Sequence, residues 1–266
     1  MNIGGLSSLD GLLVEVSRGH AVPAVLGMAR IGACMAWIPW LSPGVISSKL
    51  SRSIVALLVL MGLWPVTQGV ALPESPFDMG VSLLQEGIIG TGIGLVLALP
   101  FHMAHGMGAL IDNQRGAGVG AMLDPVSGVE ATETANFFQL MSVVIYLATG
   151  GLIVLLEVLL ASYQLAPMGQ GVTLQLQPLL GFAGVLLAGA LRMALPVLLL
   201  LFLLEVLLGV LSRYAQQMNA FSVSLAVKSL AAFVALLLYL MPTLLTEIPA
   251  LRDRLDHMQI IASVLT

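Results

Sequence analysis

The stretch LPFHMAHGMGALIDNQRGAGVGAMLDP, residues 99–125, places a polar segment inside a chain that is otherwise apolar. Two histidines, His102 and His105, come first, and Asp, Asn, Gln and Arg follow in a row at 112–115. Glycines and an Asp-Pro step then occupy 116–125, and such residues mark loops. The order predicts a helix whose polar face leads into a glycine-rich loop.

The whole chain has the composition of an integral membrane protein. Of its 266 residues, 58% are hydrophobic and 9% are charged, whereas soluble domains are about 25% charged. The mean hydropathy is +1.02 and the net charge is -4. No basic patch indicates a nucleic-acid partner, and the single cysteine, Cys34, excludes an internal disulfide framework.

Six apolar segments are long enough to cross a bilayer, which takes about 20 helical residues. They span 22–41, 53–72, 81–111, 134–163, 179–211 and 223–245. Because backbone groups in lipid must be satisfied within the segment, all six are expected to be helices and the fold to be all-α. Prolines at 65, 100 and 196 fall inside three segments and predict kinked or broken long helices. The tail, 247–266, is expected to be amphipathic.

A stripe of small residues marks the third segment. Gly87, Gly90, Gly94 and Ala98 recur at helical spacing. Such a stripe lets a second helix approach closely, so this segment is expected to pack tightly against another helix.

Charged side chains also lie within or at the edges of the apolar segments, at Glu86, Glu157, Arg192, Glu205 and Lys228. An Asp, Lys or Arg at a lipid-facing helix centre costs about 2.5–3.5 kcal/mol, so these groups are expected to face protein or water. Arg192 and Lys228 are alternative partners for Glu205. The charges are scattered, which favours pairing between helices or subunits over a proton relay.

His102, His105 and Asp112 share one face of the third helix. Such a face can bind a metal or relay protons, but three ligands from one helix are too few to assign a metal site. We expect a face that lines a wet cavity or packs on a partner. No catalytic triad and no phosphate-binding loop is present, so neither an enzyme nor a cofactor is expected.

Four groups of residues carry a resemblance. They are LIDNQRG at 110–116 with Asp-Pro at 124–125 and Gly-Gly at 150–151; Arg-Ile at 30–31 with prolines downstream; Glu86 with Gly90; and ALP at 194–196 followed by Glu205, Gly209, Arg213 and NAF at 219–221. Together they resemble the SctT family of type III secretion export-apparatus proteins (YscT, SpaR, HrcT and flagellar FliR) over nearly the whole chain. The form DNQRG is injectisome-like. One departure is Gln216-Gln217, where the family often has proline.

The resemblance implies a non-enzymatic subunit of the inner-membrane export gate through which unfolded proteins leave the bacterial cytoplasm. It implies one domain over 1–266, made of helical hairpins within a helical multi-subunit complex that is raised from the bilayer toward the periplasm. The implied partners are SctR-type and SctS-type subunits, the large export-gate protein and the switch protein of the same system, membrane lipid, and secreted unfolded proteins.

The resemblance also implies roles for particular residues. The family's pore-side loop matches about 112–130, with Gly116, Gly118, Gly120, Met122, Asp124 and Pro125 in the plug. The polar motif at its base is His102, His105, Asp112, Asn113, Gln114 and Arg115. The charges and polar groups expected to join helices or subunits are Glu86, Glu157, Arg192, Glu205, Arg213, Asn219 and Lys228. Whether Asp112 and Arg115 line the pore or lock the loop's base stays open.

Two other functions fit parts of the sequence. A proton-coupled transporter of small solutes would use the acids, the histidines and the helix breaks. A purely structural scaffold would use the same helices without any gating role for the loop.

Overall fold

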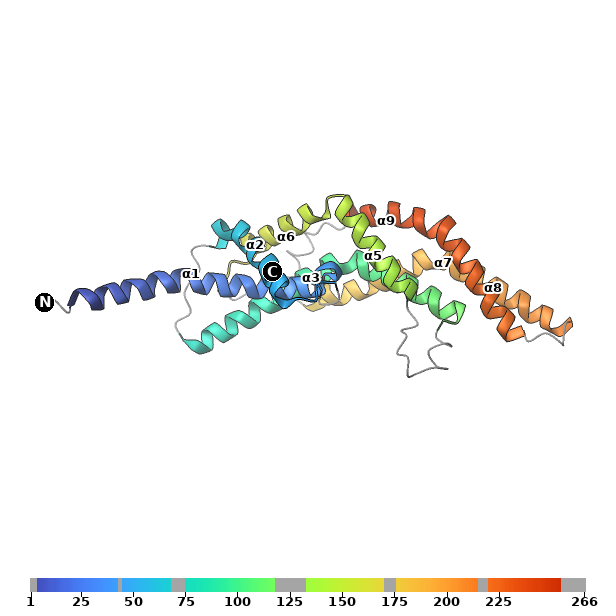
Figure 1. The fold of residues 1–266 in the computed structure, drawn as a ribbon, viewed down its shortest axis with the longest axis horizontal. Helices are drawn as coiled ribbons and strands as arrows, with labels where there is room; N and C mark the ends of the chain where they lie inside the picture. Colours follow the sequence, from blue (N-terminus) through green and yellow to red (C-terminus); the bar gives the residue numbers. More distant parts are fainter. Residues whose placement is uncertain are drawn as a thin grey trace. The chain divides into compact units, whose positions relative to one another are not determined.

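The computed structural model describes residues 4–42, 45–67, 75–117, 133–169, 176–214 and 220–254. Over these ranges the chain forms helices and no strand, as Figure 1 shows, and the all-α expectation is confirmed. The elements are α1 (Gly4–Trp37), η1 (Pro39–Leu41), α2 (Lys49–Thr67), α3 (Pro76–Arg115), α5 (Glu133–Ala148), α6 (Gly151–Leu165), α7 (Leu176–Tyr214), α8 (Ala220–Ala235), η2 (Leu236–Leu240) and α9 (Met241–Arg254).

The helices do not break at Pro65, Pro100 or Pro196, and the kinks expected there stay a prediction. Helix α3 runs continuously through Pro100, and α7 through Pro196. The break falls instead inside the fourth apolar segment, where Gly150 has φ 88° and separates α5 from α6. Glycine adopts this left-handed conformation without a steric penalty, which is why helices commonly end there. The sixth segment is interrupted as well, by the π-helix η2.

The first turn of α3 shows how the sequence starts a helix. Pro76 occupies the first helical position, where its missing N–H is not needed. The Ser75 hydroxyl oxygen accepts a hydrogen bond from the Asp78 backbone N–H at 3.1 Å, and that hydroxyl donates to the Asp78 carboxylate at 2.7 Å. This reciprocal cap explains why α3 begins before residue 81, where the apolar pattern alone placed its start.

The chain groups into two compact units. The first holds α1, α2, α6 and the part of α3 that ends at Ala98. The second holds the rest of α3, α5, α8, α9 and the part of α7 that begins at Gly181. The expectation that residues 1–266 form one domain is not tested by this division and stays a prediction.

The first unit has its core between α1, α2, α3 and α6. Leu26, Ile31, Leu60, Ile93 and Leu159 are fully or almost fully buried there. The glycine stripe of α3 lies against α1: a Cβ at Gly90 would come 2.1 Å from the carbonyl oxygen of Arg30, and one at Gly94 would come 2.6 Å from that of Cys34. Close packing is therefore confirmed at these two positions, but Gly87 has nothing within 4 Å.

Four helices are long and apolar enough to cross a membrane within the described ranges, and α5 with α6 makes a fifth if that broken pair counts as one span. Of the most apolar window in Pro76–Arg115, 72% is buried, against 17% in Ala183–Tyr214. Helix α3 is therefore an internal helix, whereas α7 presents an apolar surface that needs lipid or a protein partner. The expected segment 22–41 is not among these spans, and Arg30 lowers its hydropathy.

Candidate functional site

The Asp112 carboxylate joins the end of α3 to the start of α5, on either side of the predicted glycine-rich loop. It lies in the last turn of α3 and is 1% exposed. Its Oδ2 accepts hydrogen bonds from the backbone N–H groups of Thr134 at 3.1 Å and Ala135 at 3.3 Å, in the first turn of α5. A carboxylate at this position satisfies otherwise unpaired N–H groups and interacts favourably with the helix dipole. Asp112 therefore caps a helix that begins on the far side of the loop.

Arg115 completes this arrangement. Its Nε donates to Asp112 Oδ1 at 2.8 Å, and its guanidinium also donates to the Thr134 hydroxyl at 3.1 Å. We call Asp112, Arg115, Thr134 and Ala135 the loop-base clamp. These contacts bind the end of α3 to the start of α5, and whether Asp112 and Arg115 line the pore or lock the loop's base stays a prediction.

The backbone conformation after Arg115 ends α3 at the clamp. Gly116 has φ 85°, a left-handed conformation typical of the residue after a helix. The N–H of Ala117 donates to the Asp112 carbonyl oxygen at 3.0 Å. The main chain of Asp112 therefore fixes the first residues after α3, while its side chain binds the start of α5.

Close contact between α3 and α5 brings the clamp together. A Cβ at Gly108 would lie 2.5 Å from the Cα of Ala135, so the two backbones touch there. Only glycine allows this approach. The sequence HGMG at 105–108 carried this signal, although the stripe noted in the sequence lay farther upstream.

A second polar contact joins α3, α7 and α8. The Lys228 ammonium lies 3.1 Å from Glu205 Oε2, and Gln114 donates to the same oxygen at 3.3 Å. Glu205 is 53% exposed, so solvent weakens the attraction and the pair contributes little to stability. Of the two alternative partners for Glu205, the structure places Lys228 beside it.

An apolar groove of about 410 Å³ opens beside the clamp. Ile111 and Phe137 line it from α3 and α5, and Leu236 and Leu240 line it from η2. A π-helix is rare and is found frequently at functional sites. The groove therefore places an irregular helical segment next to the base of the loop.

A buried charge cluster lies in the first unit. Arg30 is completely buried, and its Nε donates to Glu86 Oε2 at 2.6 Å. The guanidinium also donates to the carbonyl oxygens of Ser162 at 2.9 Å and Ala166 at 2.8 Å, near the end of α6. It lies 4.3 Å from the centre of the Tyr163 ring. The cluster ties α1, α3 and α6 together through one cation.

The sequence identified part of this cluster. Glu86 was expected to face protein or water and to pair between helices or between subunits, and Arg30 was noted for its resemblance to the family. The residues from α6 were missed, because two of the acceptors are backbone carbonyls and carry no side-chain signal. An arginine in the middle of an apolar segment was the available sign that a buried acceptor set existed.

The remaining candidate residues are not brought into either cluster by the interactions described above. Glu157, Arg192, Arg213 and Asn113 are exposed, and His102 and His105 are half-buried. Within the described ranges no three potential metal ligands come together. The candidates that lie outside the described residues are Gly118, Gly120, Met122, Asp124, Pro125 and Asn219.

Comparison with known proteins gives consistent matches. The family model for bacterial export proteins, family 1, matches residues 21–252. The chain is 42% identical over 221 residues to the surface presentation of antigens protein SpaR of Salmonella typhimurium, which covers 83% of this chain and 84% of that protein. It is 26% identical over 260 residues to the Yop proteins translocation protein T of Yersinia pestis, covering 96% and 99%. It is 26% identical over 244 residues to the flagellar biosynthetic protein FliR of Pectobacterium carotovorum, covering 89% and 90%.

Proposed function

Because this chain belongs to family 1 of the bacterial export proteins, we propose that it is a gate-forming subunit of a type III secretion export apparatus. The relatives named SpaR, translocation protein T and FliR are subunits of type III secretion and flagellar export machines. The family resemblance inferred from the sequence is confirmed, and the chain is a subunit of such an apparatus. A proton-coupled transporter of small solutes is not favoured.

The gating role centres on the loop held by the clamp. Asp112 binds α5 by its side chain and the first loop residues by its backbone, so both ends of the loop meet at one residue. Residues 116 and 117, where the predicted loop begins, are thereby held at the clamp, and functional loops are commonly positioned by such a scaffold. We propose that this loop closes the conduit for unfolded protein.

The chain's surface supports assembly in the bacterial inner membrane. Leu199, Leu203 and Leu207 of α7 are exposed, and such apolar faces are covered by lipid or by neighbouring subunits. The proposed neighbours are SctR-type and SctS-type subunits, acting with the export-gate and switch proteins of the same system. The assembly is proposed to be raised toward the periplasm.

Co-purification tests membership in the complex. The full chain is co-expressed with SctR-type and SctS-type proteins, and a stable complex of all three is expected after extraction in detergent. Recovery of this chain only as a monomer from cells that express all three would contradict the proposal.

Ion leakage tests the gate. Removal of residues 118–122 should increase leakage through the assembled complex, because the deleted residues belong to the proposed plug. The control removes the equally long stretch 170–174, which should leave leakage at the wild-type level. If both deletions assemble and neither changes leakage, the chain is a scaffold and the gating proposal fails.

A further inference from the structure

An open apolar groove lies between α2 and α6 in the first unit. Its volume is about 490 Å³. Leu58 of α2 and Ile153 of α6 line it and are 63% and 62% exposed. A Cβ at Gly62, which also lines it, would have nothing within 4 Å, so the groove has room for the close approach of another helix. The other lining residues are Val59, Leu63, Leu152, Leu156, Glu157 and Leu160.

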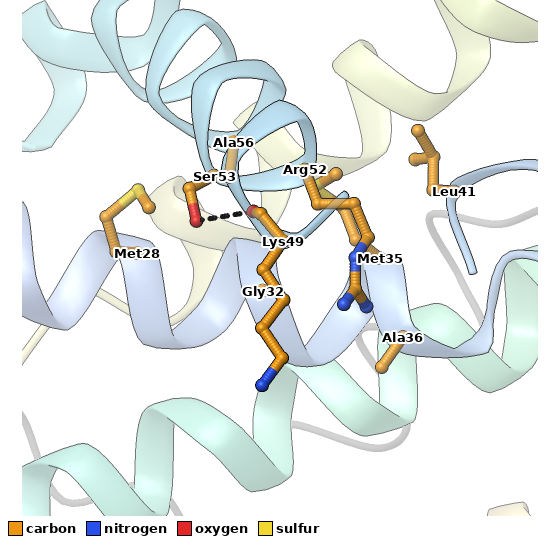
Figure 2. Close-up of a pocket in the computed structure, with 9 residues that line it drawn as sticks. All are labelled: Met28, Gly32, Met35, Ala36, Leu41, Lys49, Arg52, Ser53 and Ala56. Carbon is orange, nitrogen blue, oxygen red and sulfur yellow. Dashed lines mark hydrogen bonds between the residues drawn. The ribbon is translucent and has the colours of Figure 1, made fainter. Parts of the chain in front are cut away.

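Glu157 is the one charged side chain among the described residues that line the groove. It is exposed midway along α6, and the ion pairs found in the described part of the chain do not include it. Arg30 of the same unit is already paired with Glu86. Lys49 and Arg52 line a separate cavity of about 220 Å³ between α1 and α2, shown in Figure 2, which shares no lining residue with the groove. The Glu157 carboxylate is therefore open to a cation from another molecule.

Lipid is a poor cover for the α6 side of this groove. Helix α6 has 15 residues, so it is about 22 Å long, against about 30 Å for the hydrocarbon core of a bilayer. It counts toward a membrane span only when it is joined with α5. A charged side chain in the middle of a lipid-facing helix is also costly. Acyl chains would cover the leucines and the isoleucine but would leave Glu157 without a partner.

We propose that the groove binds an apolar helix of a neighbouring export subunit, and that a lysine or arginine of that helix pairs with Glu157. Apolar side chains of the partner helix would pack into the space between α2 and α6, as ridges pack into grooves between helices. The charge pair would fix the register of that helix in the groove, because complementary charges determine how two surfaces align. The inference rests on the proposed function, since it assigns one surface through which the chain joins the apparatus, and it agrees with an assembly raised from the bilayer.

Photo-cross-linking in the assembled complex tests what occupies the groove. A benzophenone amino acid replaces Ile153, and the full chain is co-expressed with SctR-type and SctS-type proteins. The expected result is a covalent adduct with a helix of one of those subunits, identified by mass spectrometry. An adduct with lipid alone, an adduct with another segment of this chain, or no adduct at all would overturn the proposal.

Charge variants test the pairing with Glu157. Glu157→Lys should lower recovery of the complex by roughly tenfold or more, because two cations would then meet in the interface. Glu157→Gln should cause a smaller loss, and Glu157→Asp, which keeps the charge, should retain most of the complex. Asp78→Lys is the matched control, because Asp78 is an exposed carboxylate of the same unit outside the groove. It should leave recovery near the wild-type level, since the Ser75 hydroxyl can still accept from the backbone N–H at 78.

Recovery of the wild-type complex separates this inference from the proposed function. If the wild-type chain assembles with neither partner, the proposed function fails and this inference fails with it. If the wild type assembles, and Glu157→Lys and Glu157→Gln assemble equally well, only the groove assignment fails. An equal loss in Asp78→Lys and Glu157→Lys would also overturn it, because any added cation would then suffice. Circular dichroism verifies that each variant keeps its helices.

Discussion

Replacement of Glu86 by Gln should destabilise the first unit by about 3–5 kcal/mol. The substitution preserves the side chain's size but removes the carboxylate that lies 2.6 Å from the buried guanidinium of Arg30. Ser162 and Ala166 would still offer carbonyl oxygens, but these dipoles do not neutralise a full charge. The loss is large against the roughly 5–15 kcal/mol of a typical domain.

The free energy of unfolding is measured by denaturant titration of the purified chain in detergent, followed by circular dichroism. Glu157→Gln is the control, because it makes the same chemical change at an exposed carboxylate of the same unit and should stay within about 0.5 kcal/mol of wild type. The double variant Arg30→Met with Glu86→Leu should cost less than the sum of its single substitutions, since no unpaired charge remains buried. A cost below about 1 kcal/mol for Glu86→Gln, or strict additivity in the double variant, would refute the reasoning.

Three further predictions follow from contacts in the two units. Gly90→Ala should lower the free energy of unfolding by about 1–3 kcal/mol, because its Cβ would lie 2.1 Å from a carbonyl oxygen of α1. Gly87→Ala, with open space around it, should be neutral or stabilising by up to about 1 kcal/mol. Both variants are compared with wild type in thermal melts of the purified chain, and equal effects would contradict this packing. Asp112→Asn should cost about 1.5–3 kcal/mol and increase ion leakage through the assembled complex, since it removes the charged acceptor of the clamp; unchanged melting would show that the clamp does not hold α5. Lys228→Gln should cost less than about 1 kcal/mol, and less at high salt, because Glu205 is largely solvated; a large loss that is insensitive to salt would disprove this.

The positions of the helices were mostly predictable from the sequence, and their interruptions were not. Long apolar segments in lipid must form helices to satisfy their backbone hydrogen bonds, so composition was sufficient to predict the all-α fold class. Pro100 and Pro196 leave their helices continuous because a proline removes one backbone hydrogen bond and the rest of a long helix stays bonded. The break at Gly150 was signalled by the pair of glycines at 150–151, because glycine readily ends a helix. The hydropathy gave no sign of this break, since it stays high on both sides.

The two clusters show a similar limit. The contact between Asp112 and Arg115 is local, at a separation of three residues on a helix, and the spacing favours it. The contacts of Asp112 with Thr134 and Ala135 cross the loop and depend on how α3 meets α5. Backbone acceptors in particular are invisible in a sequence, because every residue has a carbonyl group. Sequence therefore identified the carboxylate but not the helix that it caps.

The Arg30 cluster has a consequence for how the chain enters the membrane during synthesis. Arg30 lies 56 residues before Glu86 and 132 before Ser162, so it is made long before its acceptors. An unpaired arginine at the centre of a lipid-exposed helix costs about 2.5–3.5 kcal/mol. The first apolar segment is therefore unstable in lipid by itself. It becomes stable only after α3 and then α6 have been synthesised and can pair with Arg30. Assembly of the first unit is in this sense timed by the distance along the chain between a cation and its partners.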